Sequence, residues 1–336
     1  MEIHFSGLLG QERIVRQLTL EVRNQRLAHA YLLIGRKGSG RGHLALHLFM
    51  ALNCEKRHQQ EAPCLQCASC LRAGRRQHEN LIILTPPHDQ LSAQIKVDDL
   101  REVMRSTTFP PLNQGVRLIL IREAEHLNQA AANALLKTLE EPPPHNLIML
   151  SVQEAAGLLP TLISRCRRLN LQPLAPDIML KALQERGCNQ PEARVALSGG
   201  SLGLALELDP TGMQEVLEDL LAQLEQASSL NGWWTLAENL VKQFKQVDGQ
   251  DRMDRLGLVG LLELLAQHYR DQAVSMAGRP ALALLPNMTN RYLPLFQAVE
   301  NFNQVRLCQN QILGNARPVL ALITLLNQLG NAVQGC

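Results

Sequence analysis

The sequence predicts an α/β domain with a parallel sheet, followed by a part made only of helices. Residues 116–121 form a short apolar run, rich in β-branched residues, that fits a strand buried on both faces. A helical pattern over residues 129–141 and a second apolar run, residues 147–152, follow at once. Strand, helix and strand at this spacing make the two strands parallel. Beyond Pro173 the apolar spacing is helical and no strand pattern recurs.

Length and composition limit the classes of protein that the chain can belong to. Its 336 residues suggest two or three domains, and a hydrophobic content of 46% is enough for real cores. A net charge of +2 and an aromatic content of 3% do not favour binding of nucleic acid by global charge or base stacking. Residues 1–10 lack the features of a secretory signal, and no apolar run approaches the ~18 residues of a membrane span. We therefore expect a cytoplasmic protein without a membrane partner, whose cysteines are reduced or bind metal.

A glycine-rich loop follows the first predicted strand. Residues 9–25 have the spacing of a helix, residues 30–34 fit a strand, and residues 44–52 fit a second helix. Between the last two lies the octapeptide GRKGSGRG, residues 35–42. Strand, glycine loop and helix is the context in which a loop binds phosphate. The candidate phosphate contacts are Gly35, Gly38, Gly40 and Arg41.

Two residues of this loop differ from those that phosphate hydrolysis requires. A working loop has a lysine that reaches the β- and γ-phosphates, followed by a serine or threonine that binds Mg²⁺. Arg41 and Gly42 stand at these positions. Arginine keeps the charge but is larger and planar, and glycine has no oxygen for the metal. We expect no turnover here, and two interpretations stay open: a turn that packs strand against helix, or a weak nucleotide site.

Four cysteines follow with the spacing Cys-x9-Cys-x2-Cys-x2-Cys: Cys54, Cys64, Cys67 and Cys70. Four thiolates within 17 residues can form a tetrahedral zinc site. The protein would fill every coordination position, so the zinc would be structural. A redox-active Cys-x-x-Cys pair is the alternative, but such a pair usually occurs alone.

The module around these cysteines, residues 54–78, is basic. Its lysines and arginines could contact DNA, although a solvated surface is the simpler interpretation of a run of charges. His58 and His78 lie nearby. Four thiolates already complete a zinc site, so we expect both histidines to be solvated residues and not ligands.

The next elements lead to the position where a metal would be held. Residues 81–84 fit a strand and residues 97–106 a helix, capped near Asp98. In a hydrolysing enzyme of this architecture, the strand at 116–121 ends in Asp-Glu, where Asp binds Mg²⁺ and Glu orients the attacking water. This chain has Arg122-Glu123. The metal site is therefore altered as well as the loop. Asn128 is expected to cap the following helix, which three prolines, residues 142–144, end.

The remainder of the chain reads as helices separated by glycine, proline and asparagine. Short helices are predicted over residues 177–186 and 191–197, with a third after the turn at 198–203. Longer helical patterns cover residues 214–226, 233–246, 252–276, 291–304 and 318–329. This pattern predicts a helical bundle without an evident catalytic constellation. Trp233 and Trp234 are expected in its core.

The chain resembles the AAA+ clamp-loader family of bacterial DNA polymerase III. The resemblance rests on LAHAYLL at residues 27–33, the four-cysteine module, ALLKTLEEPP at residues 134–143 and Ser-Arg-Cys at residues 164–166. The last two motifs are highly specific when they occur together at this spacing. The motifs cover roughly residues 5–210, and the rest of the chain resembles the family by order of elements only.

The resemblance implies a fold and a set of functional residues. It implies a RecA-like α/β domain over residues 1–172 with a zinc module at 54–78, a small helical lid over 173–210 and a helical collar (oligomerisation) domain over 211–336. It also implies that Arg165 is an arginine finger, which reaches the γ-phosphate of ATP on a neighbouring subunit. Propensity alone favours a surface salt bridge for this residue. Ser164 and Cys166 would shape and pack the turn.

A non-hydrolysing stator subunit is the function that these features predict together. Gly203 stands where the resemblance implies a nucleotide-sensing arginine in motor subunits, so the nucleotide site departs from the motor pattern in three places. Such a subunit would join gamma/tau and delta subunits in a hetero-pentamer that loads the sliding clamp onto primed DNA, with Zn²⁺ as its structural cofactor. One alternative is an active gamma/tau-type ATPase, which Arg41, Gly42 and Arg122 disfavour. The other is a zinc-dependent DNA-binding module, which the basic residues around the cysteines favour.

Overall fold

The structure is a computed structural model that describes residues 3, 5, 7–59, 61–87, 94–207, 212–226, 229–244, 255–284, 293–313 and 316–334. The chain divides into two compact units, Met1–Ile178 with Gly200–Leu204, and Met179–Gly199 with Ala205–Cys336. The finer division into three domains that the resemblance implied stays a prediction. No described helix combines the length and the apolarity that crossing a membrane requires.

A five-stranded parallel sheet lies at the centre of the first unit and confirms the predicted α/β fold. The strands are β1 (Ala30–Ile34), β2 (Leu81–Leu84), β3 (Arg117–Ile121), β4 (Asn146–Val152) and β5 (Arg167–Asn170), in the order β2-β3-β4-β1-β5. The strand β5 was not among the predicted elements. Only Leu169 of its four residues is buried, so it has no apolar run that marks a strand.

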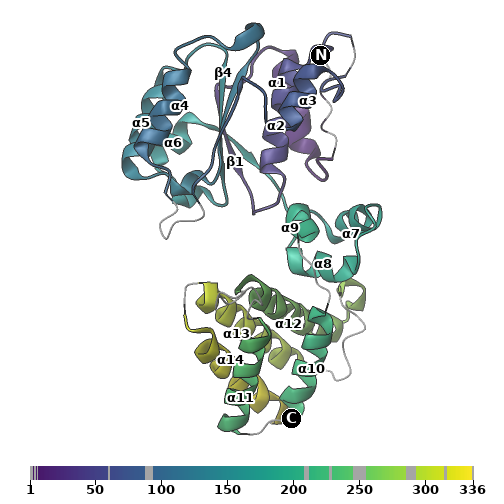
Figure 1. The fold of residues 1–336 in the computed structure, drawn as a ribbon. Helices are drawn as coiled ribbons and strands as arrows, with labels where there is room; N and C mark the ends of the chain where they lie inside the picture. The colour runs from purple at the N-terminus through teal and green to yellow at the C-terminus, as the bar shows by residue number, and fades with distance from the viewer. Residues whose placement is uncertain are drawn as a thin grey trace. The chain divides into compact units, whose positions relative to one another are not determined.

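Helices cover both faces of this sheet (Figure 1). One face carries α1 (Glu12–Arg23), α2 (Arg41–Asn53) and α3 (Ala68–Gly74), and the other carries α4 (Val97–Ser106), α5 (Gln129–Glu140) and α6 (Pro160–Arg165). The strand β1 shows how the sequence divides between the two cores. Tyr31 and Leu33 pack on the α1–α3 side, and Ala30 and Leu32 on the α4–α6 side. Successive side chains of a strand point to opposite faces, so an apolar strand supports both layers.

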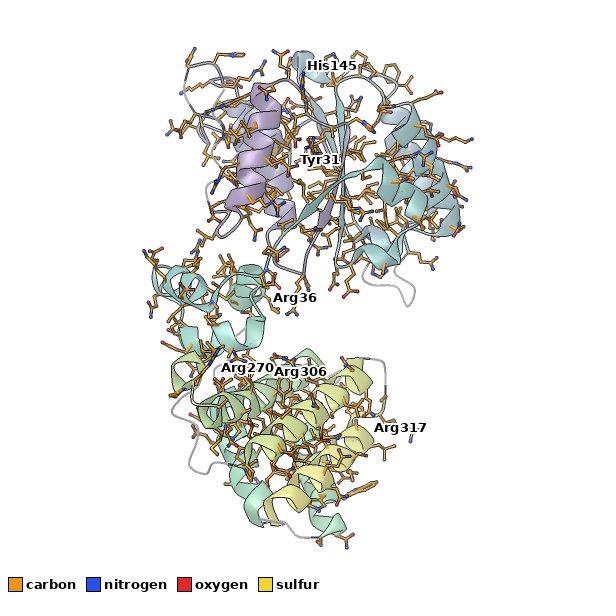
Figure 2. The ribbon with its side chains drawn as sticks, turned by 180° about the vertical axis from the view of Figure 1, so that it is seen from behind. Tyr31, Arg36, His145, Arg270, Arg306 and Arg317 are labelled. Atoms are coloured by element: carbon orange, nitrogen blue, oxygen red, sulfur yellow. The ribbon has the colours of Figure 1, made fainter. Side chains whose placement is uncertain are left out.

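Tyr31, labelled in Figure 2, joins the first helix to the sheet. Its hydroxyl donates to the carboxylate of Glu21 on α1 and accepts from the backbone N–H of Ala28 at 3.0 Å. The same carboxylate pairs with Nη2 of Arg167 on β5, at 3.1 Å. Burial, together with the hydrogen bond to Glu21, raises the pKa of Tyr31. One buried carboxylate therefore ties together α1, β1 and the edge strand β5.

The second unit is built from helices. Its elements are α8 (Pro191–Ser198), α10 (Met213–Gln226), α11 (Leu230–Gln243), α12 (Arg255–Met276), α13 (Leu295–Leu313) and α14 (Pro318–Gln334), while α7 (Pro176–Gln184) and α9 (Leu202–Glu207) span the boundary between the units. A leucine-rich core joins α10 to α14. Arg306 of α13 (Figure 2) donates through both Nη atoms to Glu263 of α12, with Nη2 at 2.8 Å from Oε1. No strand follows Asn170 in the described part of the chain, as predicted.

The two tryptophans differ in their surroundings. Trp233 is 2% exposed and packs in the core of the second unit, as predicted. The prediction that Trp234 lies in the core is wrong, because its side chain is 48% exposed and Nε1 donates to Glu238 at 2.9 Å. Adjacent positions on a helix point about 100° apart, so only one of two neighbouring tryptophans faces the core.

Candidate functional site

The glycine loop joins the carboxyl end of β1 to α2. Gly38 and Gly40 have φ angles of 74° and 94°, a left-handed conformation that glycine adopts without strain. The helix α2 begins at Arg41, three residues before the predicted start. In open parallel sheets, ligands bind beyond the carboxyl ends of the strands. The loop therefore lies where a phosphate site is expected.

A segment far along the chain closes against this loop. Ser201 Oγ donates to the carbonyl of Lys37 at 2.7 Å, and the N–H of Gly203 donates to the carbonyl of Gly38 at 3.0 Å. A Cβ atom on Gly203 would lie 2.8 Å from Cα of Gly38, so no side chain fits there without movement. We call this contact of Lys37, Gly38, Ser201 and Gly203 the loop lock. It gives a physical reason for glycine at position 203.

A cavity of about 320 Å³ adjoins the loop. Its lining is rich in positive charge, from Lys37, Arg41, Arg76 and Arg122, with Glu123 as the single carboxylate among the lining residues described. The apolar part of the lining is Leu46, Leu81, Ile83, Leu118 and Leu120.

Arg41, which stands where a phosphate loop is expected to carry lysine, is buried. Its side chain is 8% exposed, and its Nη1 has no hydrogen-bond partner among the described residues. Burial lowers the pKa of Arg41, whereas the negative charges of Glu125 and Glu123 act in the opposite direction. The carboxylates of Glu123 and Glu125 therefore partly neutralise the positive charge of Arg41 that would attract a phosphate.

Neither position that would bind Mg²⁺ in a hydrolysing enzyme carries a suitable donor. Gly42 has no side-chain oxygen, and no heavy atom lies within 4 Å of a Cβ built on it. Arg122 follows β3, and its backbone N–H continues the sheet pairing to the carbonyl of Leu84 at 2.8 Å. Carboxylate or hydroxyl oxygens are needed at both places. These substitutions do not fit a magnesium-dependent hydrolysis at this loop.

Arg165, the predicted finger, ends α6 on the other face of the sheet. Its Nη2 lies 2.7 Å from Oε1 of Glu140, the last residue of α5, and its Nη1 donates to the carbonyl of Thr161 at 3.1 Å. Ser164 Oγ donates to the same carbonyl at 3.0 Å, and Cys166 is 8% exposed within the core under α5 and α6. Arg165 thus makes the surface salt bridge that propensity favours, and of its two neighbours Ser164 is exposed and Cys166 is buried.

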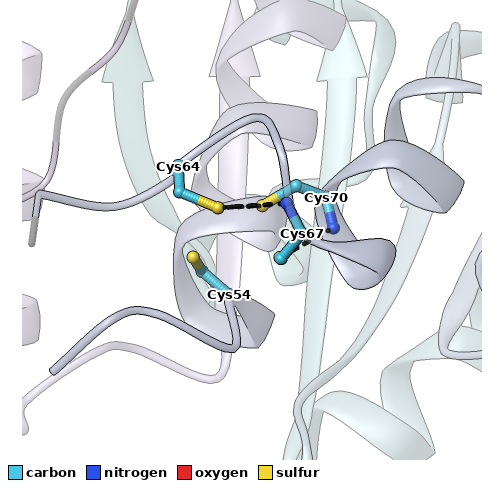
Figure 3. Close-up of side chains that lie close together, drawn as sticks. All are labelled: Cys54, Cys64, Cys67 and Cys70. Atoms are coloured by element: carbon cyan, nitrogen blue, oxygen red, sulfur yellow. Dashed lines mark hydrogen bonds between the residues drawn. The ribbon is translucent and has the colours of Figure 1, made fainter. Parts of the chain in front are cut away.

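The four predicted cysteines lie together (Figure 3): Cys54 directly after α2, Cys64 and Cys67 before α3, and Cys70 in the first turn of α3. Their sulfur atoms all lie within 4.8 Å of one another, and the Sγ atoms of Cys64 and Cys70 are 4.0 Å apart. A tetrahedral zinc site with Zn–S bonds of about 2.3 Å places its sulfurs about 3.8 Å apart. The donor set and its spacing therefore fit a bound metal ion. The seven cysteines described are all free of disulfides.

Backbone hydrogen bonds favour the thiolate of Cys64, whereas burial raises the pKa of Cys54 and of Cys70. The N–H of Cys67 donates to Sγ of Cys64 at 3.3 Å, and that of Cys70 donates to Sγ of Cys67 at 3.4 Å. Burial acts to raise the pKa of Cys64, but hydrogen bonds from the backbone N–H groups of Gln66 and Cys67 bring it down to about 6. A lowered pKa makes this sulfur a better metal ligand at neutral pH.

The prediction that His78 is solvated is wrong, although His78 is not part of the cysteine cluster, in line with the prediction that it is not a ligand. This side chain is 7% exposed, its Nε2 lies 3.1 Å from Ser69 Oγ, and its Nδ1 accepts from the N–H of Asn80 at 3.1 Å. Both ring nitrogens therefore hold the cysteine module against the chain that enters β2. Burial lowers the pKa of His78, which favours a neutral ring. His58 is exposed, as predicted.

Fold and site together define a class: an α/β protein with a parallel sheet and a glycine-rich loop after its first strand. Residues 10–175 match the sequence profile of the family described as "DNA polymerase III, delta subunit". The parallel sheet, the glycine loop, the cysteine cluster and Arg165 all lie within the matched region.

Individual relatives are subunits of the same polymerase. The delta' subunit of Bacillus subtilis is 34% identical over 185 residues, which cover 55% of this chain and 54% of that protein. The delta' subunit of Pseudomonas aeruginosa is 33% identical over 218 residues, covering 62% and 66%. The tau subunit of B. subtilis is 29% identical over 228 residues, covering 68% and 38%. The chain thus spans less than two thirds of the length of each of these relatives.

A solved structure also aligns over most of the chain. It is a gamma subunit-related protein of Thermotoga maritima, with a TM-score of 0.46 and 19% identity, covering 94% of this chain and 99% of the other.

Proposed function

We propose that this chain is a non-hydrolysing, delta'-type subunit of a DNA polymerase III clamp loader. It would act as a stator, which keeps its own glycine loop fixed and completes the ATP site of a neighbouring subunit with Arg165. Relatives that are delta' and tau subunits support the assignment to this complex. The proposed partners are gamma/tau and delta subunits in a hetero-pentamer, and the proposed targets are the sliding clamp and primed DNA.

The loop lock is the observation that carries this proposal. A motor subunit must let its phosphate loop respond to nucleotide, but here two hydrogen bonds and a glycine–glycine contact hold the loop to residues 201–203. Arg41 is offset by carboxylates, and Gly42 and Arg122 cannot bind Mg²⁺. Arg165 keeps a side chain that is 36% exposed and can meet a partner. A glycine loop held by these contacts, together with an accessible arginine on the other face of the sheet, suits a subunit that assists hydrolysis elsewhere.

The test uses the reconstituted complex of this chain with gamma/tau and delta subunits. An arginine supplied in trans is worth about 10³–10⁵ in rate at the site it completes. Arg165→Ala should therefore abolish turnover at the neighbouring site and lower the DNA-stimulated ATPase activity of the complex. Arg168→Ala, which removes an exposed arginine three positions away, is the matched control and should leave that activity unchanged.

The same preparation separates the alternatives. The chain alone should show no ATP hydrolysis, whereas a gamma/tau-type motor would hydrolyse ATP without partners. It should also show no salt-sensitive DNA binding alone, whereas a zinc-dependent DNA-binding module would bind with log affinity falling against log salt. Equal ATPase activity of the complexes with Arg165→Ala and Arg168→Ala would refute the finger role.

We also propose that the four cysteines hold one structural Zn²⁺. All four are protein ligands, so no position remains for a substrate. The ion would fix the residues between α2 and α3 and would take no part in ATP hydrolysis.

A further inference from the structure

We propose that Glu140 is a positioning residue, which holds the guanidinium of Arg165 in the free chain and releases it to a phosphate of the neighbouring subunit's nucleotide. The inference rests on the proposed finger role of Arg165. It assigns a regulatory partner to that arginine within the same chain.

The two motifs on which the family resemblance rests meet at this ion pair. Glu140 belongs to the ALLKTLEEPP stretch at the end of α5, and Arg165 to Ser-Arg-Cys at the end of α6. The carboxylate is 2.7 Å from Nη2, within the range of a strong charge-assisted hydrogen bond. Carboxylate and phosphate oxygens are equivalent acceptors for a guanidinium. Glu140 therefore accepts the hydrogen bond from Arg165 that a γ-phosphate oxygen would accept.

Local helix physics does not account for a carboxylate at this position. Glu140 is the last residue of α5, where the negative end of the helix dipole disfavours an acidic side chain. Arg165 offsets that unfavourable charge across the α5–α6 contact. The neighbouring Glu141 is exposed and makes no ion pair within the described part of the chain. The pairing is thus specific to Glu140, and position 141 provides a matched control.

The geometry also allows the pair to open. The side chains are 36% and 51% exposed, so water can replace the contact on both sides. Exposed ion pairs are weak and are screened by salt. The second contact, from Nη1 to the carbonyl of Thr161, lies within α6 and can persist while Nη2 changes partner. A triphosphate carries more negative charge than one carboxylate, so docking repels Glu140 and attracts Arg165.

The experiment titrates this chain into its partner subunits and measures DNA-stimulated ATPase activity. Glu140→Gln keeps the shape of the side chain and removes its charge, so less work is needed to free Arg165. The half-saturating concentration should fall about twofold to fivefold at low salt, as expected for loss of an exposed ion pair. The difference should disappear at high salt, and kcat should stay at the wild-type value.

Controls separate this inference from the proposed function. Glu141→Gln removes the same charge one position further and should change neither the half-saturating concentration nor its salt dependence. Equal behaviour of the two glutamine variants would overturn the positioning role while leaving the finger role intact. A lower kcat in Glu140→Gln would also overturn it, because Glu140 would then be needed in the productive state. Unchanged kcat in Arg165→Ala would overturn both.

Discussion

Replacement of Gly203 by alanine is the sharpest test of the loop lock. The added Cβ would lie 2.8 Å from Cα and 2.9 Å from the carbonyl oxygen of Gly38. Both are backbone atoms, so no side chain can turn away. Overpacking of this kind costs about 1–3 kcal/mol. Loss of the Gly203 hydrogen bond destabilises the fold by a further ~0.5–1.5 kcal/mol. The higher helix propensity of alanine stabilises it by up to about 1 kcal/mol. We expect a net destabilisation of about 1–3 kcal/mol.

Differential scanning calorimetry measures this effect, with hydrogen exchange to locate it. The lock belongs to the first unit, so the unfolding transition of that unit should move down and the amides of residues 36–42 should exchange faster. Gly42→Ala is the control, because no heavy atom lies within 4 Å of its Cβ and alanine favours the helix it joins. Equal stability and exchange in the two variants would refute the lock.

Three further predictions follow from the other contacts. Metal analysis of protein purified without chelators should find about one zinc per chain, and Cys67→Ser should release it. Burial lowers the pKa of His268 to about 4, so between pH 6.5 and pH 4 only the unfolded chain gains a proton at this residue. The free energy of unfolding of the second unit, followed by tryptophan fluorescence, should therefore fall by up to about 3 kcal/mol as the pH is lowered from about 6.5 to 4. His268→Gln should remove this pH dependence. Asn53→Ala leaves the N–H and the carbonyl of Val116 without their bonds to the Asn53 amide, each 3.0 Å, and should cost about 2–4 kcal/mol in denaturant unfolding.

Much of the α/β unit could be predicted because its signals are local. The apolar runs became β3 and β4 within one residue, and Asn128 caps α5 by accepting from the N–H of Ala131 at 2.8 Å, as predicted. The capping of α4 was displaced, since Asp99 and not Asp98 accepts from the N–H of Lys96. The helix α13 extends to Leu313, beyond the predicted end at residue 304, because Cys308 and Ile312 continue its buried face.

In the candidate site, too, the features set by local sequence could be predicted, and the contacts between distant residues could not. The spacing of the four cysteines predicted their cluster, because residues within a short segment can be brought together by local turns. The loop lock joins Gly38 to Gly203, and no sequence pattern links positions so far apart. The turn at residues 198–203 was visible, but its partner was not. The pairing of Glu140 with Arg165 likewise depends on how α5 packs against α6.

The helix α2 gives the cysteine cluster a mechanical reach. It starts at Arg41, inside the glycine loop, and Cys54 follows its last residue. Its 13 residues form a rod of about 20 Å. If the cysteines bind Zn²⁺ as proposed, the ion would hold one end of α2 in place, and the rigidity of the glycine loop at the other end would then depend on metal supply. Zinc depletion would then make the glycine loop more mobile, although the loop does not contact the ion.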